Sequence, residues 1–222
     1  MLAEIIMTNL NEIKQKLNKD GWVLFNNPNE DEVLLEISKK MGQIIMHPNG
    51  KLIDYLTPKD KTEAIEKTFS HKYGFEKFPF HTDTAFWNIP ARYVLMSSKD
   101  ISSTETLILT LDSVNQLNTE EISVLEKSIF LVKTNQSNFY CSVLTRQNGN
   151  QILRYDPNIM KAINSYAMEA ITVIENIVKN SEIHRINWNS PKILIIDNWK
   201  ILHSRSSIVD KENRIIKRIY IS

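Results

Sequence analysis

Apolar residues repeat with helical spacing in three parts of the chain. The first part covers residues 3–19 and ends at Asp20-Gly21. Its apolar side chains are Ile5, Ile6, Leu10, Ile13 and Leu17. The second part covers 33–41, after an acidic start, and the third and longest covers 158–179. The sequence therefore predicts three helices, and a further short helix that opens at 118–121.

Short apolar runs bounded by turn residues indicate strands between these helices. The predicted strands cover 22–25, 44–46, 51–56, 92–96, 104–111, 129–132, 191–197 and 214–221. We expect 51–56 to return beside 44–46 after a turn. Asn148-Gly149 lies between the runs 143–146 and 151–155, a pattern typical of a β-hairpin.

The order of these elements favours one α+β domain. At 222 residues, the chain fits a single domain over 1–222. Strands dominate, with helices at the N-terminus and one inserted before the end, which suits an α+β fold better than a doubly wound sheet. The chain has only five glycines and no Gly-rich phosphate loop, which argues against a nucleotide-binding fold.

Composition limits the partners and the cellular location that we expect for the protein. The chain is 42% hydrophobic and 24% charged, as in ordinary globular proteins, and its net charge of +1 does not indicate bulk nucleic acid as a partner. The single cysteine, Cys141, excludes an intramolecular disulfide framework. Residues 1–7 are too short and too soon interrupted for a signal peptide or a membrane span. We therefore expect a cytoplasmic protein with no membrane partner.

The most informative stretch for chemistry is 78–87, Phe-Pro-Phe-His-Thr-Asp-Thr-Ala-Phe-Trp. On a strand, His81 and Asp83 point to the same face and are able to share one metal ion. A third ligand is needed, and the best candidate is His203, in the loop after the apolar run 191–197. Two histidines and one carboxylate form the facial triad of non-haem Fe(II) oxygenases. The irregular segment 57–80, just upstream, predicts a lid or a substrate wall.

The last predicted strand carries arginines on one face. Arg214, Ile216, Arg218 and Tyr220 share that face by the period of two along a strand. If the face points inward, its two guanidinium groups need an anion.

These motifs resemble the Fe(II)/2-oxoglutarate-dependent dioxygenases of the taurine dioxygenase and clavaminate synthase type. The matching motifs are His81-x-Asp83, Asp197-Asn198-x4-His203-x-Arg205 and Asn213-Arg214-x2-Lys217-Arg218. Their order and spacing fit the family from about Gly21 to the end. The resemblance implies a double-stranded β-helix (jelly-roll) core with flanking helices.

The resemblance also implies roles for individual residues. The ligands of Fe(II) are His81, Asp83 and His203, and the open positions take 2-oxoglutarate and O2. Arg214 meets the far carboxylate of 2-oxoglutarate, and Thr106 matches the threonine that assists it, with a plain strand threonine as the alternative. The predicted substrate side consists of Arg218, Arg205, Phe86 and Trp87. Their alternatives are a salt bridge within the barrel for Arg218, a surface position for Arg205, and core packing for the aromatic residues.

The expected reaction is hydroxylation or desaturation of an unactivated C–H bond in a small, polar, amino-acid-like or natural-product-pathway molecule, with decarboxylation of 2-oxoglutarate to succinate. Asp83 keeps the carboxylate that related halogenases replace with a small residue, which disfavours halogenation. Members of the family that act on free amino acids usually carry H-x-E, whereas this chain has H-x-D.

Three alternatives stay open. A nucleic-acid demethylase would use the four cations between Lys211 and Arg218, although apolar residues interrupt them. A 2-oxoglutarate or metal sensor would use the same ligands without turnover. A zinc hydrolase fits the ligand types but leaves Arg214 and Arg218 without a role. A Ser/His/Asp hydrolase is disfavoured because no nucleophile-elbow motif is present.

Overall fold

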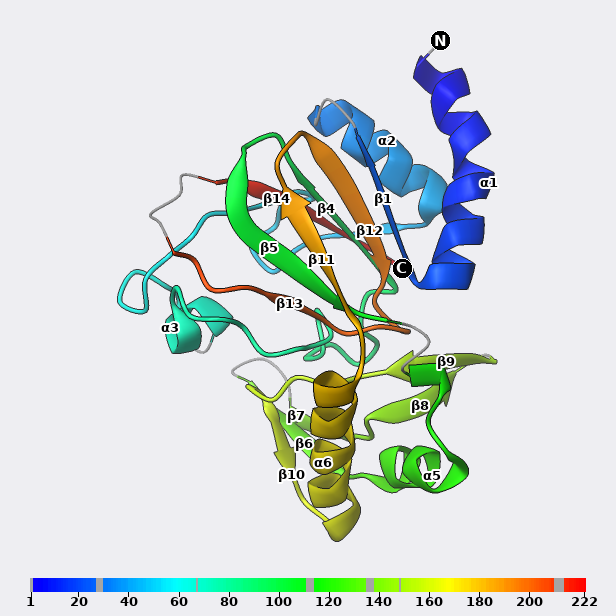
Figure 1. The fold of residues 1–222 in the computed structure, drawn as a ribbon, viewed down its shortest axis with the longest axis vertical. Coiled ribbons are helices and arrows are strands. Elements are labelled where there is room, and N and C mark those ends of the chain that lie inside the picture. Colours follow the sequence, from blue (N-terminus) through cyan, green and yellow to red (C-terminus); the bar gives the residue numbers. More distant parts are fainter. Residues whose placement is uncertain are drawn as a thin grey trace.

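The computed structural model describes residues 2–26, 30–66, 68–110, 114–134, 138–147, 149–209 and 214–222, with side chains from residue 10 onward. Figure 1 shows an upper part, built of two sheets with helices on one side, above a smaller part that holds α5 and α6. Helices and strands are mixed throughout, which confirms the predicted α+β class. Among the described helices, none combines the length and apolar character needed to cross a bilayer.

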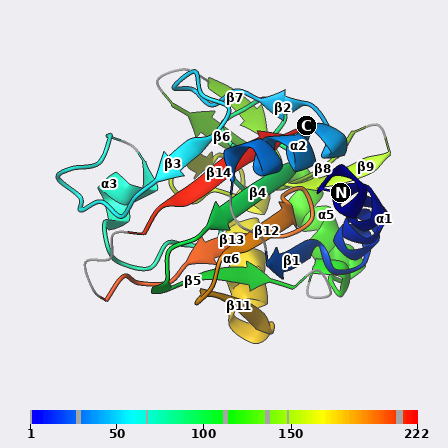
Figure 2. The same ribbon diagram turned by 90° about the horizontal axis from the view of Figure 1, so that it is seen from above.

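The larger sheet is antiparallel and holds most of the predicted strands (Figure 2). Its path is β1 (Trp22–Asn26), β12 (Lys192–Asp197), β4 (Tyr93–Ser98), β14 (Ile216–Ile221) and β2 (Ile44–Ile45). Strand β3 (Asp54–Leu56) also pairs with β14. The prediction that 51–56 returns against 44–46 is therefore wrong: both strands bond to β14, which runs past each of them in turn.

The second sheet has three strands, β11 (Ile183–Trp188), β5 (Ser102–Leu109) and β13 (His203–Arg205). An apolar core joins the two sheets. It includes Val94, Met96, Leu194 and Ile196 from the larger sheet and Ile108, Ile186 and Trp188 from the smaller one. Two sheets that face each other across such a core are the layers that the predicted jelly roll requires.

Helices α1 (Leu2–Asp20) and α2 (Asp31–Met41) cover the outer face of the larger sheet (Figure 1). Alternating residues of the strands face this layer, so one sheet supports two cores. The helical side of this core is formed by Ile13, Leu17, Val33, Leu34 and Ile37.

The smaller part of the molecule packs below β5 around α5 (Thr119–Lys127) and α6 (Ser165–Asn180). Strands β10 (Met160–Ala162), β6 (Phe130–Lys133) and β7 (Asn138–Cys141) form a three-stranded sheet. Strands β8 (Leu144–Gln147) and β9 (Asn150–Leu153) form the predicted hairpin. Their shared core reaches Leu107 and Leu109 of β5 and Leu202 beside His203.

The predictions failed where local patterns compete with capping and pairing. The helix predicted at 158–179 begins only at Ser165, because Asn164 caps it and residues 160–162 pair with β6. The segment 57–80 contains a short helix, α3 (Phe69–Tyr73), and β11 was not predicted. Four residues of the predicted features lie outside the described residues: Leu111 of a strand, Asn148 of the hairpin, Lys211 of the run of cations and Asn213 of the last motif.

Candidate functional site

His81 and His203 face each other across an isolated antiparallel bridge. The amide of His81 donates to the carbonyl of His203 at 2.9 Å, and the amide of His203 donates to the carbonyl of His81 at 3.1 Å. Side chains of directly opposed residues lie on the same side of such a pair. The two imidazole centroids are 4.5 Å apart, so backbone pairing brings together two histidines far apart in sequence.

Asp83 lies in a turn rather than on the expected strand. Thr84 has φ 56°, which bends the chain directly after Asp83. Asn198, at the end of β12, holds this turn: its Oδ1 accepts from the Asp83 amide at 2.9 Å, and its Nδ2 donates to the carbonyls of Asp83 and Ala91 at 3.0 and 2.8 Å. The strand argument for His81 and Asp83 is therefore wrong, although the two side chains do converge.

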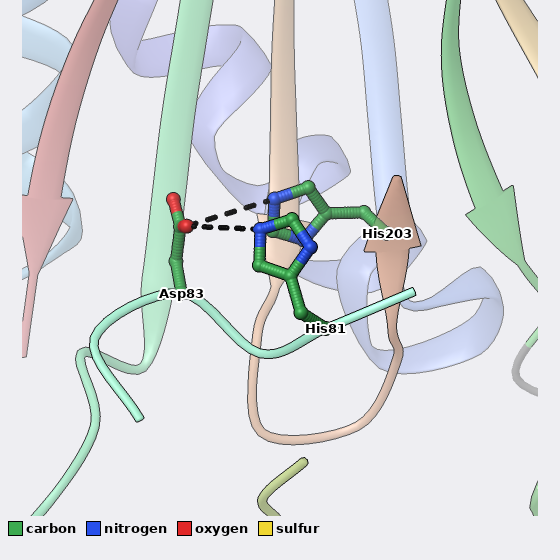
Figure 3. A group of neighbouring side chains, drawn as sticks. All are labelled: His81, Asp83 and His203. Carbon is green, nitrogen blue, oxygen red and sulfur yellow. Dashed lines mark ion pairs between the residues drawn. The ribbon is translucent and has the colours of Figure 1, made fainter. Parts of the chain in front are cut away.

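The three predicted ligands meet in one buried cluster (Figure 3). Their candidate ligand atoms all lie within 4.8 Å of one another, and each residue is 6% exposed. Asp83 Oδ1 is 3.4 Å from His81 Nε2 and 3.9 Å from His203 Nε2. These distances exceed an ordinary hydrogen bond.

Two ligand atoms at right angles around one ion, each about 2.1 Å from it, lie roughly 3 Å apart. The distances of 3.4 and 3.9 Å are somewhat wider than this value, so the three side chains need only a small movement to close on one ion. The donor set of two imidazoles and one carboxylate therefore fits a divalent transition metal.

The protonation states of His203 and Asp83 suit metal binding. Burial lowers the pKa of His203 to about 3, with the charge of His81 acting in the same direction, so its ring is neutral near pH 7. Burial alone would raise the pKa of the Asp83 carboxyl, but Arg218 and the two imidazoles lower it well below its usual range. Burial alone would lower the pKa of the His81 imidazole, but the Asp83 carboxylate outweighs burial and raises this pKa, so a metal ion at this ring has to displace a proton. His81 Nδ1 lies 2.9 Å from the carbonyl of Pro79. A proton held there leaves Nε2 free to bind the ion.

The cluster opens into a cavity of about 610 Å³, within the usual range for a small-molecule site. The face predicted for the last strand lines it, since Arg214, Ile216, Arg218 and Tyr220 all reach the cavity. Thr106 and Arg205 also line it.

Arg214 and Thr106 both line the cavity, and Arg214 contacts β5, the strand that carries Thr106. Arg214 Nη1 donates to the carbonyl of Thr104 at 2.8 Å, and Thr106 Oγ1 accepts from the indole of Trp188 at 3.2 Å. Arg214 is 7% exposed. A guanidinium buried against a cavity favours an anion as the ligand there.

Arg205 adds a second positive charge to this part of the cavity. Its Nη2 donates to the carbonyls of Gly74 and Glu76, and its guanidinium lies 3.6 Å from the ring centre of Phe78. Burial lowers the pKa of Arg205 to about 10, and the charge of Arg214 acts in the same direction. The repulsion between the guanidinium groups of Arg205 and Arg214 favours an anion bound close to both.

The two aromatic residues predicted on the substrate side, Phe86 and Trp87, have different surroundings. Phe86 lines the cavity and also contacts the core below β5. Trp87 packs against the ring of Tyr220, with centroids 5.5 Å apart, and joins the core between the sheets. Trp87 thus packs behind Tyr220, which itself lines the cavity.

Solved structures match the whole chain, whereas no model of a known protein family and no curated protein matches it. Asparagine oxygenase in complex with Fe(II), 2S,3S-3-hydroxyasparagine and succinate matches with a TM-score of 0.77 at 16% identity, over 99% of this chain and 79% of that one. The non-heme iron oxygenase OrfP with Fe and alpha-ketoglutaric acid matches with a TM-score of 0.77 at 17% identity, over 99% and 80% of the two chains. PvcB from Pseudomonas aeruginosa, an Fe, alpha-ketoglutarate dependent oxygenase, matches with a TM-score of 0.70 at 16% identity, over 96% and 79%.

The chain has the fold of the non-haem iron, 2-oxoglutarate-dependent oxygenases. The fold class predicted from the motifs is thereby confirmed. At these identities the roles of single residues rest on the geometry of the site.

Sequence reasoning missed residues that shape the site from a distance. Arg154 is 5% exposed and donates to the carbonyls of Ala85, Trp87 and Asn88, so it clamps the chain just after Asp83. Asp156 lines the cavity and is 6% exposed. Arg154 and Asp156 follow β9, and no local pattern distinguishes them from the polar end of a hairpin.

Proposed function

We propose that this protein is an Fe(II)- and 2-oxoglutarate-dependent oxygenase that hydroxylates, or desaturates, an unactivated C–H bond of a small, polar, amino-acid-like substrate. The observation that carries the proposal is the convergence of His81, Asp83 and His203 beside the Arg214 and Thr106 wall of one cavity. The shared fold with asparagine oxygenase and OrfP supports it.

In this proposal His81 Nε2, Asp83 Oδ1 and His203 Nε2 would hold Fe(II) beside the cavity. When bound, Fe(II) would activate O2, the oxidant of the reaction: one oxygen atom would convert 2-oxoglutarate to succinate and CO2, and the other would be available to oxidise the C–H bond of the substrate. The burial of all three ligands limits water at the reacting face.

The cavity wall next to β5 orients the co-substrate. Arg214 presents a planar fork that suits a carboxylate, and the Thr106 hydroxyl lies on the same wall. Arg205 contributes charge to this region while it fixes the backbone at Gly74 and Glu76. A dicarboxylate that reaches from the metal to Arg214 and Arg205 would bind the metal at one end and neutralise the arginines at the other.

The substrate side of the cavity offers a negative charge. Among the ion pairs of the described residues, none involves Asp156, whose Oδ1 accepts from the Asn158 amide at 2.8 Å. Burial raises the pKa of this carboxyl, which favours its neutral form. A cation that binds beside Asp156 would lower the pKa again and favour the carboxylate. An ammonium group of an amino-acid-like substrate supplies such a cation.

A free small molecule suits the volume of the cavity and the net charge of +1 better than nucleic acid does. A cytoplasmic location is part of the proposal, since the single Cys141 provides no disulfide framework.

The test is turnover of 2-oxoglutarate. The Fe(II)-loaded protein is incubated with 2-oxoglutarate and O2, with and without a panel of amino acids, and succinate is quantified. We expect slow succinate formation alone and faster formation with the substrate, both abolished in His203→Ala. Metal-dependent 2-oxoglutarate binding without any succinate would instead identify a sensor, and absence of both would refute the proposal.

A further inference from the structure

We propose that Tyr220 and Arg218 are positioning residues that hold the second oxygen of Asp83, so that this carboxylate meets the metal through Oδ1 alone. The inference rests on the proposed metal ligands. It assigns Tyr220 a role that neither its sequence position nor the resemblance to a family indicated.

The two oxygens of Asp83 have different surroundings. Figure 3 shows one oxygen directed at both imidazole rings and the other turned away. The second oxygen, Oδ2, accepts from Arg218 Nη1 at 3.2 Å and from the Tyr220 hydroxyl at 3.3 Å. Both donors come from β14, two residues apart on one face.

A second set of contacts fixes these two donors. Arg218 Nη2 binds Asp54 Oδ2 at 3.1 Å, and the carbonyl of Arg218 lies 3.0 Å from His47 Nε2. The ring of Tyr220 packs against the rings of His47 and Trp87, with centroids 4.4 and 5.5 Å away. Neither donor is able to follow Asp83 if the carboxylate rotates, so the orientation of the carboxylate is set by the sheet.

This orientation matters because of the number of metal positions the chemistry needs. A facial triad leaves three positions of an octahedral ion open. A carboxylate that binds through both oxygens takes one of them. Two hydrogen bonds to Oδ2 favour the one-oxygen mode and keep that position available.

The same contacts change the expected role of Arg218. Its guanidinium lies between Asp83 and Asp54, so two carboxylates already share its positive charge. We therefore expect an anion in the cavity to bind Arg214 and Arg205 rather than Arg218. The effect of Arg218 on the metal passes through Asp83.

The first test is Mn(II) affinity of the Tyr220→Phe protein, measured by titration against a chelator. This change removes one hydroxyl and keeps the ring that packs on His47 and Trp87. Loss of a hydrogen bond to a metal-binding group typically weakens metal binding about 10- to 100-fold, and we expect roughly tenfold. Tyr140→Phe is the control: Tyr140 is 67% exposed on β7 and is not among the residues that line the cavity, so we expect its change to leave the affinity as it is.

The second test is the crystal structure of the Mn(II)-loaded wild-type and Tyr220→Phe proteins. We expect Asp83 Oδ2 outside ligand distance in the wild type and drawn toward the ion in the variant. An unchanged affinity, or a carboxylate that keeps its orientation in Tyr220→Phe, would overturn the inference. Wild-type protein that binds Mn(II) no better than His203→Ala would instead defeat the proposed metal site, so the two failures are distinguishable.

Discussion

Replacing Asn198 with alanine tests how the fold positions Asp83. The side chain is fully buried and makes three hydrogen bonds, to the amide and carbonyl of Asp83 and the carbonyl of Ala91. The Asp83 carbonyl keeps a partner in the Thr84 hydroxyl at 2.6 Å. Two groups, the Asp83 amide and the Ala91 carbonyl, therefore lose the bond that Asn198 provides. At about 1–3 kcal/mol for each unsatisfied buried group, the free energy of unfolding falls by roughly 2–6 kcal/mol.

Urea unfolding of the metal-free protein measures this loss, and an Mn(II) titration measures the accompanying loss of metal affinity. Asn189→Ala is the control: its exposed side chain accepts from Lys192, and its removal changes stability by no more than about 0.5 kcal/mol. If Asn198→Ala cost less than about 1 kcal/mol, the turn would hold Asp83 without this anchor, and the reasoning would be refuted.

Three further outcomes are expected. Arg214→Ala removes a charged hydrogen bond worth about 1.5–3 kcal/mol, which weakens 2-oxoglutarate binding roughly 10- to 150-fold by calorimetry, and an unchanged affinity would place the co-substrate elsewhere. Arg154→Met releases the carbonyls of Ala85, Trp87 and Asn88; only the bond to Ala85 is fully buried, and water can replace the other two, so the free energy of unfolding falls by about 1–3 kcal/mol in urea. A stability equal to wild type would show that these bonds are dispensable. Mn(II) at 100 times its Kd raises the free energy of unfolding by about 2.7 kcal/mol, seen as a higher Tm that EDTA reverses, and His203→Ala removes the effect.

The sequence was informative where the signal is local. Amphipathic spacing located α1 and α2, and Asn148-Gly149 located the hairpin of β8 and β9. The alternation of Ile186 and Trp188 with Arg185 and Asn187 is a local signal for β11, which the predicted strands did not include. Local patterns did not show which strands pair, because β2 and β3 each find their partner in β14, at the far end of the chain.

Motif order led to the three candidate ligands, but it did not show the geometry that brings them together. Strand periodicity placed His81 and Asp83 on one face, whereas the structure uses a bridge to His203 and a turn at Thr84. The residues that fix this arrangement, Asn198 and Arg154, act by hydrogen bonds to backbone groups. Asn198 belongs to one of the matching motifs, whereas Arg154 belongs to none. Neither residue type shows in the sequence which backbone groups it holds, because every residue offers the same carbonyl and nearly every residue the same amide.

The most direct test of the central claim is an anaerobic titration of the metal-free protein with Fe(II) and then 2-oxoglutarate. Chelation of Fe(II) by the 2-keto acid gives a visible metal-to-ligand charge-transfer band. We expect the band in the wild-type protein, its loss in His203→Ala, and its appearance only at much higher 2-oxoglutarate in Arg214→Ala. Fe(II) shown to be bound, with no band at any 2-oxoglutarate concentration, would contradict the account.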